Sequence, residues 1–410
     1  MALNFSNNQL LSIQNSHYQD RAIYWTVKNY ETNADTRFDS KIDAMLYCNT
    51  LPHATAHFHW YEDAFARLNP SVEPVETLAE LCRQRAQELR DTYQYIRLFY
   101  SGGTDSHTAL VSFIDNNIHL DEIVVDIKLD KDTNTAINTT NREIAIVTIP
   151  YLKTIAHRLP KTKITMSQAT VKDADDWFSI ADDTNIPIMM DGGMGIFNMD
   201  TGWALLNALS TSHHNDWCDL FGGTKARLFK KNSNWYMFTV DSTVPQYTMS
   251  DRYEDFFVSR NIPFLYVKTA HALKHYHTHK QSTDAFVNGF YSNLGIEYNC
   301  ALGRVPTHHM TQIKRVFMDI DYSSRLWEAK KISGYYGNMF YNNVIGTPEG
   351  QRWYKKFLVM QEVMLSDKYK DIWNTDRYGN PVTAAGSRGL VSKFYSLTDG
   401  QAYSSDQVSF

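Results

Sequence analysis

The stretch from residue 76 to residue 168 alternates between helical and strand-like patterns, and this alternation constrains the fold more than any other feature. Three apolar runs have the length of strands, at 96–100, 122–129 and 163–168. Four segments have helical periodicity, at 76–93, 105–116, 139–159 and 174–182. Strands separated by helices pair in parallel through right-handed crossovers. We therefore expect an α/β fold built on a doubly wound parallel sheet.

The flanking segments have different patterns. Residues 1–75 predict a small N-terminal α+β unit, with a strand at 21–28 and a helix at 40–49. This unit ends in a linker that contains Pro70 and Pro74. We assign residues 76–270 to the α/β domain, which includes a further strand candidate at 235–240. Residues 271–410 predict a C-terminal region that is mainly helical.

Composition narrows the classes of protein to consider. The 410 residues carry a net charge of −5, so binding to nucleic acid is not favoured, although a local basic patch remains open. The four cysteines form no CxxC pair, which argues against a zinc or iron–sulfur site built on them and fits a reducing compartment. The first twenty residues are polar, and no apolar run approaches the ~20 residues that cross a bilayer. We expect a cytoplasmic protein without a membrane partner.

A glycine-rich loop at residues 101–106 joins the strand at 96–100 to the next helix and reads Ser-Gly-Gly-Thr-Asp-Ser. Two glycines let the backbone turn tightly and approach a ligand. The helix start adds unpaired N–H groups and the positive end of the helix dipole, which together bind anions. The polar side chains that can add ligand atoms are Ser101, Thr104, Asp105 and Ser106. A helix cap without a ligand is the alternative, but strand, glycines, Asp-Ser and helix all agree with an anion site.

This loop resembles the SGGxDS signature of the PP-loop ATP pyrophosphatase superfamily, which includes asparagine synthetases, GMP synthetase, NAD synthetase and tRNA-modifying enzymes. The resemblance implies an adenine nucleotide alpha hydrolase-like, Rossmann-like domain at 76–270 and a substrate or cap region at 271–410. It also implies that ATP, with Mg²⁺, is cleaved to AMP and pyrophosphate while a substrate is adenylated. The residues implied to hold the phosphates are Ser101, Gly102, Gly103, Thr104, Asp105 and Ser106, with Asp105 also a catalytic group and metal ligand. The residues implied to lie at adenine and ribose are Val125, Asp126 and Ile127.

A second segment, Asp-Leu-Phe-Gly-Gly at residues 219–223, resembles the DELFGG segment of asparagine synthetases. Asp219 stands where that family has Glu, and Cys218 stands where it has Asp. The resemblance implies that Asp219 binds metal and that Gly222 and Gly223 pass close to the pyrophosphate. The cations that follow, Lys225 and Arg227, are further catalytic candidates. An ordinary surface loop with a Gly-Gly turn is the alternative.

The expected function is therefore that of an asparagine-synthetase-like ligase that forms an amide or related C–N bond. The chain begins Met-Ala-Leu and lacks the N-terminal cysteine of glutamine-dependent asparagine synthetases, so free ammonia, an amine or a nitrogen-donating partner would supply the nitrogen. A PP-loop enzyme that modifies a nucleobase or tRNA, with Cys218 as a candidate for sulfur transfer, is one alternative. A non-catalytic nucleotide-binding protein is another. The length and layout also resemble asparagine-synthetase-like PP-loop proteins of phages, which would place the protein in the host cytoplasm.

Four histidines occur at residues 271–279. On a helix, His271 and His275 are one turn apart, the spacing of two zinc ligands. The sequence provides no evident third ligand and lacks the Glu of an H-E-x-x-H motif. Polar helix positions beside a cleft are the alternative.

Overall fold

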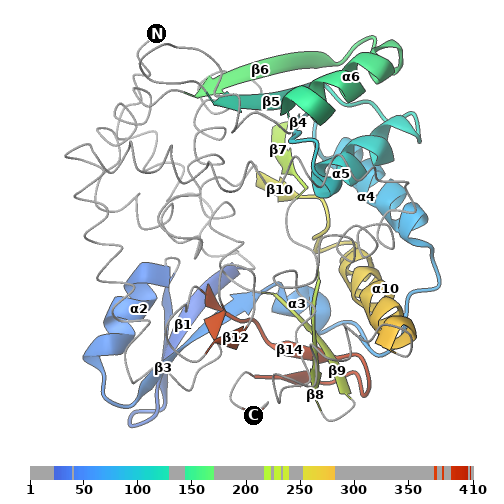
Figure 1. Ribbon diagram of the computed structural model, residues 1–410. Helices are drawn as coiled ribbons and strands as arrows, with labels where there is room; N and C mark the ends of the chain where they lie inside the picture. The colour runs from blue at the N-terminus through green and yellow to red at the C-terminus, as the bar shows by residue number, and fades with distance from the viewer. Residues whose placement is uncertain are drawn as a thin grey trace.

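A five-stranded parallel sheet forms the centre of the computed structural model, which describes residues 23–38, 41–128, 144–169, 217–222, 226–231, 234–239, 253–281, 374–375, 381–382, 389–404 and 407. Its strands lie in the order β10-β7-β4-β5-β6, and every neighbouring pair is parallel (Figure 1). The strands are β4 (Tyr95–Phe99), β5 (Glu122–Lys128), β6 (Lys163–Ala169), β7 (Trp217–Phe221) and β10 (Tyr253–Asp255). Counted along the chain, the first strand lies centrally, the next two lie on one side of it and the last two on the other. This is the Rossmann-like order, so the expected α/β class is confirmed.

The helices of this domain begin where local sequence signals place them. Helix α4 (Leu78–Thr92) starts with a capping box, in which Thr77 and Glu80 each satisfy the other's backbone N–H group. Helix α5 (Thr104–Ile114) follows the loop after β4. The third helical segment joins a π-helical turn (Ile144–Thr148) to α6 (Ile149–Ile155), which has a proline in its first turn, and to a short 3₁₀ turn (Ala156–Arg158). The helix expected at 174–182 lies outside the described residues.

One face of the sheet packs against α4, α5 and α6, which gather on the same side of it in Figure 1. Successive side chains of a strand point to opposite faces of the sheet, so every second residue enters this core. The strand residues that enter this core are Ile96, Leu98 and Tyr100 of β4 and its exit, Ile123 and Val125 of β5, and Cys218 and Leu220 of β7. They meet apolar residues of α4 (Leu81, Ala86, Leu89) and of α5 (Ala109, Leu110, Phe113). Burial of this face fixes the position of the loop between β4 and α5.

The N-terminal unit is an antiparallel sheet in the order β2-β1-β3 that contacts one helix. Its elements are β1 (Ile23–Asn29), β2 (Ala34–Phe38), α2 (Lys41–Thr50) and β3 (Ala54–Trp60). Strands β1 and β3 alternate between buried and half-buried side chains. A short helix, α3 (Glu62–Phe65), follows β3. The strand and helix expected in this unit are both confirmed.

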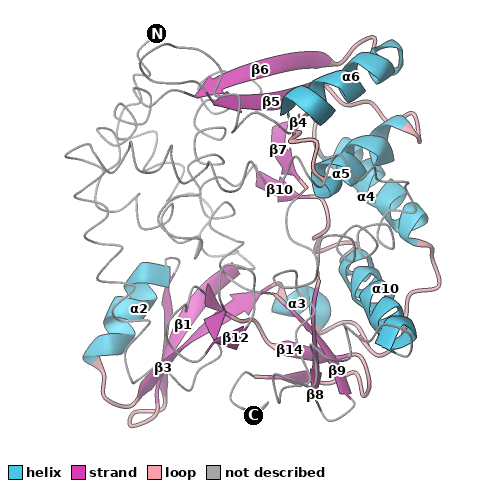
Figure 2. Cartoon of the chain, in the orientation of Figure 1, coloured by secondary structure: helices cyan, strands magenta, loops and turns pink. Residues whose placement is uncertain are grey.

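A second antiparallel sheet combines segments from distant parts of the chain (Figure 2). Its order is β15-β14-β9-β8, with β8 (Arg227–Lys231), β9 (Asn234–Phe238), β14 (Phe394–Ser396) and β15 (Ala402–Tyr403). A smaller sheet contains β11 (Asn374–Thr375), β12 (Pro381–Val382) and β13 (Gly389–Leu390). The sequence predicted β9 but not its partner β14.

Helix α10 (Pro263–Gln281) continues across the domain boundary expected between residues 270 and 271. The helix continues past this boundary because its buried face continues on both sides of it. The side chains of Tyr266, Ala270 and Leu273 are all buried. The Tyr266 hydroxyl donates a 2.9 Å hydrogen bond to the Phe238 carbonyl of β9. After α10, the described residues of the C-terminal region form strands, and the helices expected between them lie outside the described residues. Within the described part of the chain, no helix has both the length and the apolarity needed to cross a bilayer.

Arg85 of α4 anchors the edge strand β10 to the helix layer. Its guanidinium donates to the carboxylates of Glu88 and Glu254, at 2.8 and 2.6 Å, and to the carbonyl oxygen of Asp255 at 2.8 Å. The side chain is only 3% exposed. Two carboxylates and a carbonyl oxygen share the one buried guanidinium of Arg85. Removing this cation would leave both carboxylates without their charged partner, which is costly in a buried site.

We predict that Arg85→Met lowers the free energy of unfolding by about 3 kcal/mol, because it leaves Glu88 and Glu254 without their cation. The measurement is urea unfolding followed by tryptophan fluorescence. Arg83→Met is the matched control, since Arg83 lies on the same helix but is exposed, and we expect a change within about 0.5 kcal/mol. Equal losses in the two variants would show that Arg85 does not hold β10 in place.

Candidate functional site

The loop at residues 101–106 lies at the carboxyl end of β4 and closes on itself through side-chain hydrogen bonds. The Gly103 amide donates to Ser101 Oγ at 3.2 Å, and Ser106 Oγ donates to the Gly103 carbonyl at 3.1 Å. The two serine hydroxyl oxygens are 3.2 Å apart. Gly103 is the N-cap of α5, so the first amides of that helix follow the loop directly. The expected strand–loop–helix arrangement is confirmed.

Gly102 has a backbone conformation and a neighbour that only glycine allows. Its φ angle is +77°, in the left-handed region. A Cβ atom at this position would overlap the Oγ1 atom of Thr148. The Thr148 hydroxyl donates a 2.9 Å hydrogen bond to the Ser101 carbonyl and thereby braces the loop from the π-helical turn. Sequence reasoning did not find Thr148, because nothing in its local pattern indicates this contact.

Gly222, directly after β7, packs against the first turn of α5. A Cβ atom at residue 222 would lie closer than 3.0 Å to the Ser106 amide nitrogen and to the Asp105 carbonyl group. A side chain at this position is therefore excluded unless the two segments move apart. The structure brings together the loop at residues 101–106 and residues 219–222 of the second segment.

These segments flank the point at which the strand order of the sheet reverses. From β4, the chain proceeds to β5 and β6 on one side, and later to β7 and β10 on the other. In open α/β sheets, ligands bind outside the carboxyl ends of the strands at such a point. The loop after β4 and the exit of β7 both lie at this position.

Strand β5 extends past its last pairing with β4. The β4–β5 register ends at Phe99 opposite Val124, and the Tyr100 amide adds a 2.9 Å hydrogen bond to the Val124 carbonyl. Strand β5 then continues to Lys128, paired with β6 on its other side. Of the adenine-contact candidates, Val125 has a fully buried side chain and Ile127 is half-buried, so Val125 can offer a ligand only its backbone.

Asp219, which the sequence suggested as a metal ligand, forms an ion pair inside the sheet. Its carboxylate is completely buried and accepts a 2.7 Å hydrogen bond from Arg97 Nε, across from it on β4. The Arg97 guanidinium also lies 4.5 Å from the centre of the Trp217 ring. The ion pair with Arg97 engages Oδ1 of Asp219 inside the sheet, and the role of Asp219 as a magnesium ligand stays a prediction.

The other candidates are described only in part. Asp105 is half-buried in the first turn of α5. Gly223 and Lys225 lie outside the described residues. Arg227 begins β8, where its backbone pairs with Phe238. The structure does not describe the side chains of Thr104, Asp126 and Arg227.

His107 lies on α5, directly after the last residue of the loop, and was not among the residues predicted from the sequence. Its Nδ1 atom is 3.1 Å from the Tyr100 hydroxyl, and its ring meets Tyr151 edge-on at 4.6 Å. Burial lowers the pKa of His107 from 6.5 to about 4, so the imidazole is neutral at physiological pH.

Cys218 lies on β7 and is completely buried. Burial, with the nearby acidic residues Glu254 and Asp219, raises the pKa of its thiol well above the ordinary value. The thiol therefore stays protonated, and this environment argues against Cys218 as the sulfur carrier of a thiolation reaction.

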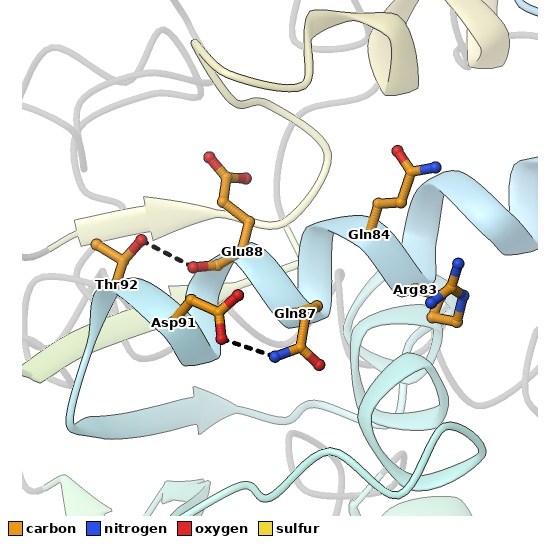
Figure 3. A pocket seen from close by; sticks show the side chains of 6 residues that line it. All are labelled: Arg83, Gln84, Gln87, Glu88, Asp91 and Thr92. Carbon is orange, nitrogen blue, oxygen red and sulfur yellow. Dashed lines mark hydrogen bonds between the residues drawn. The ribbon is translucent and has the colours of Figure 1, made fainter.

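A shallow pocket on the outer side of α4 has no chemical link to the loop (Figure 3). Its polar groups are largely paired within the helix: Gln87 donates to Asp91 at 2.7 Å, and Thr92 donates to the Glu88 carbonyl at 2.7 Å. No residue of the 101–106 loop lines this pocket. The site around the loop is therefore defined by its backbone geometry rather than by this pocket.

A scan of the chain against protein-family models gives no match, and a search of curated proteins gives none either.

We predict that His107→Gln makes stability less dependent on pH between about 6.5 and 5. A buried histidine whose pKa falls to about 4 binds fewer protons when folded than when unfolded, so acidification through this range favours unfolding. The full effect of His107 is roughly 3 kcal/mol by pH 4. The measurement is urea unfolding across this pH range.

The exposed His157 provides the control variant, His157→Gln. His271, whose pKa is also lowered by burial, adds the same slope to every protein in the series. If His107→Gln retains the full pH slope of the parent, the neutral state assigned to His107 is wrong.

We also predict that Gly222→Ala disrupts the loop. The added methyl group must displace the first turn of α5 or the end of β7, because the backbone of Asp105 and Ser106 occupies its position. Overpacking of this kind costs about 1–3 kcal/mol. Urea unfolding measures this loss, and amide hydrogen exchange at residues 101–106 shows whether it is local. Ala226→Gly, a small substitution at the next described residue after Gly222, should leave exchange in the loop unchanged.

Proposed function

We propose that the protein binds ATP with residues 101–106 and cleaves it between the α- and β-phosphates to adenylate the carboxyl or carbonyl group of a substrate. The observation that carries this proposal is the contact of Gly222 with the first turn of α5. It brings the SGGTDS loop and the DLFGG segment to one place, at the reversal of strand order where α/β sheets bind ligands.

The convergence supports the proposal because the two segments are far apart in the chain. Arg97, on the strand before the loop, and Asp219, the first residue of the second segment, are 122 positions apart in the chain. The parallel pairing of β4 with β7 places the segments that follow these two strands at the same edge of the sheet. Gly102 and Gly222 each lie so close to a neighbouring segment that a side chain would not fit. Both contacts lie around the start of α5, and the start of a helix is a favourable place for an anion.

Each described residue of the loop has a role in this proposal. The backbone of Gly102 and Gly103 and the first amides of α5 face the phosphates, and the hydroxyls of Ser101 and Ser106 orient the loop. Asp105, half-buried in the same turn, has the carboxylate that Mg²⁺ prefers as a ligand. When bound, Mg²⁺ neutralises charge on the phosphates. The backbone of β5 beyond Val124 is the expected contact for adenine.

The resemblance to asparagine synthetases and the state of Cys218 favour a C–N ligase within this class. A nitrogen nucleophile displaces AMP from the adenylate, whereas sulfur transfer through Cys218 would require a reactive thiolate. Ammonia, an amine or a nitrogen-donating partner would supply the nucleophile. The loop contributes position and charge stabilisation in the first step.

We predict that Asp105→Ala weakens binding of magnesium-ATP at least tenfold, about 1.4 kcal/mol, because it removes the acidic group at the phosphate site. Isothermal titration calorimetry measures this change. Asp115→Ala is the matched control: Asp115 caps the other end of the same helix and pairs with Arg158 at 2.8 Å, so ATP binding should be unchanged.

Catalysis is tested by release of pyrophosphate and AMP with a panel of carboxylates and ammonium. Production of both, dependent on Asp105, supports the ligase. Binding of ATP without AMP formation across the panel would instead indicate a nucleotide-binding protein that is not a ligase. Absence of ATP binding in the unmodified protein would refute the proposal as a whole.

A further inference from the structure

Two histidines of α10 and one glutamate of the linker before α4 form a compact cluster. His271 and His275 are one helical turn apart, and Glu73 lies opposite them. The His275 Nε2 atom is 2.5 Å from Glu73 Oε2, and His271 Nδ1 is 4.0 Å from the same oxygen. The three potential ligand atoms lie within 4.8 Å of one another. Glu73 therefore offers the third potential ligand atom, which the sequence alone did not indicate.

The hydrogen bond of His271 to the linker sets its tautomer. His271 Nε2 is 2.9 Å from the Pro70 carbonyl oxygen, which can only accept, so Nε2 carries the hydrogen and donates. In the neutral ring this leaves the lone pair on Nδ1, the atom nearest Glu73. Histidines that bind metals usually donate their other ring N–H to a carbonyl or carboxylate in this way. The His271 ring is buried, so its orientation is fixed by packing as well.

The two oxygens of Glu73 have separate neighbours. Glu73 Oε1 accepts a 2.9 Å hydrogen bond from Lys268, whose ammonium also donates to the Pro74 carbonyl at 2.9 Å. Glu73 Oε2 faces both histidines. One oxygen therefore holds the carboxylate in position, and the other is directed at the two rings.

Two of the three separations between potential ligand atoms are close to those of a tetrahedral zinc site, and the third, between the two histidines, is no more than 4.8 Å. With bonds of about 2.0 Å, two ligand atoms of such a site lie about 3.3 Å apart. The His275–Glu73 separation of 2.5 Å must widen and the His271–Glu73 separation of 4.0 Å must shorten, each by less than ~1 Å. Because the His275 side chain is 64% exposed, it has room to adjust, and water can reach a fourth coordination position.

We propose that Glu73, His271 and His275 form a binding site for a divalent transition metal, with Zn²⁺ as the ion best suited to two imidazoles and one carboxylate. Bound zinc joins the linker around Pro70–Pro74 to α10 and so fastens the N-terminal unit to this helix. The site uses no residue of the 101–106 loop and does not depend on the function proposed for that loop.

The competing explanation is a clasp without metal, in which Lys268 and His275 hydrogen-bond to Glu73 and stabilise the folded chain directly. At a metal site, zinc binds the folded chain and stabilises it through Glu73 and the two histidines. In a clasp, substitution of His275 or Glu73 weakens stability, but zinc neither binds the parent at this cluster nor stabilises it.

The test uses the purified full chain, titrated with zinc sulfate in competition with a chromogenic chelator. We expect His275→Ala and Glu73→Gln each to lower zinc affinity at least tenfold, as loss of a ligand should cost no less than loss of a supporting residue. His53→Ala is the matched control, since exposed His53 pairs with Glu31 at 3.4 Å and belongs to no such cluster among the described residues, so the zinc affinity of this variant should equal that of the parent. His275 is exposed and Glu73→Gln is isosteric, so both variants should fold.

Two further readouts separate zinc binding from a structural effect of the substitutions. Co²⁺ should give the visible absorption bands of a low-symmetry four-coordinate site in the parent and lose them in His275→Ala. Zinc should raise the thermal midpoint of the parent but not of His275→Ala. Equal zinc affinity in the parent and His275→Ala, or no zinc-dependent rise in the thermal midpoint of the parent, would overturn the proposal in favour of the clasp.

Discussion

The buried ion pair between Arg97 and Asp219 connects the two strands on which the candidate phosphate site depends. It links β4 to β7 across 122 residues of sequence and matches the register of their parallel pairing. Either charge would be costly inside the sheet without the other, so a shifted register is strongly disfavoured. In the observed register, the first residue after β7 is Gly222, which lies against Ser106. A slip of one residue would place the bulky Phe221 there instead and would turn each side chain of β7 to the opposite face.

Much of the central domain could be predicted from the sequence because its signals are local. Periodicity located β4, β5, β6, α4 and α5 within one or two residues, and the Gly-Gly pair identified the loop. The positions that were missed depend on contacts between distant segments. Nothing in the residues around Thr148, Glu73 or β14 shows that they meet Ser101, His275 or β9. The ion pair of Asp219 is the clearest case, since its motif suggested a metal ligand but gave no sign of Arg97 as its partner on the neighbouring strand.

The two proposed binding sites use different parts of the chain. Around residues 101–106, the ligand surface is largely backbone, so its requirements appear in the sequence as glycines and small hydroxyl residues. The Glu73–His271–His275 cluster uses side chains from a linker and a helix, and only the helix spacing is visible in the sequence. A site built from backbone leaves a contiguous motif, whereas a site built from side chains of separate elements becomes recognisable only when they are placed in space.

The pairing of β14 with β9 has a consequence for how the protein is made. The hydrogen bond between Trp235 and Thr398 spans 163 residues, so β8 and β9 leave the ribosome long before the strand that covers them. At ~5–20 residues per second, β9 presents unpaired backbone groups for roughly 8–30 s during synthesis. Such an open strand invites pairing with a neighbouring nascent chain. Synthesis of β14 therefore doubles as the step that protects this sheet from aggregation.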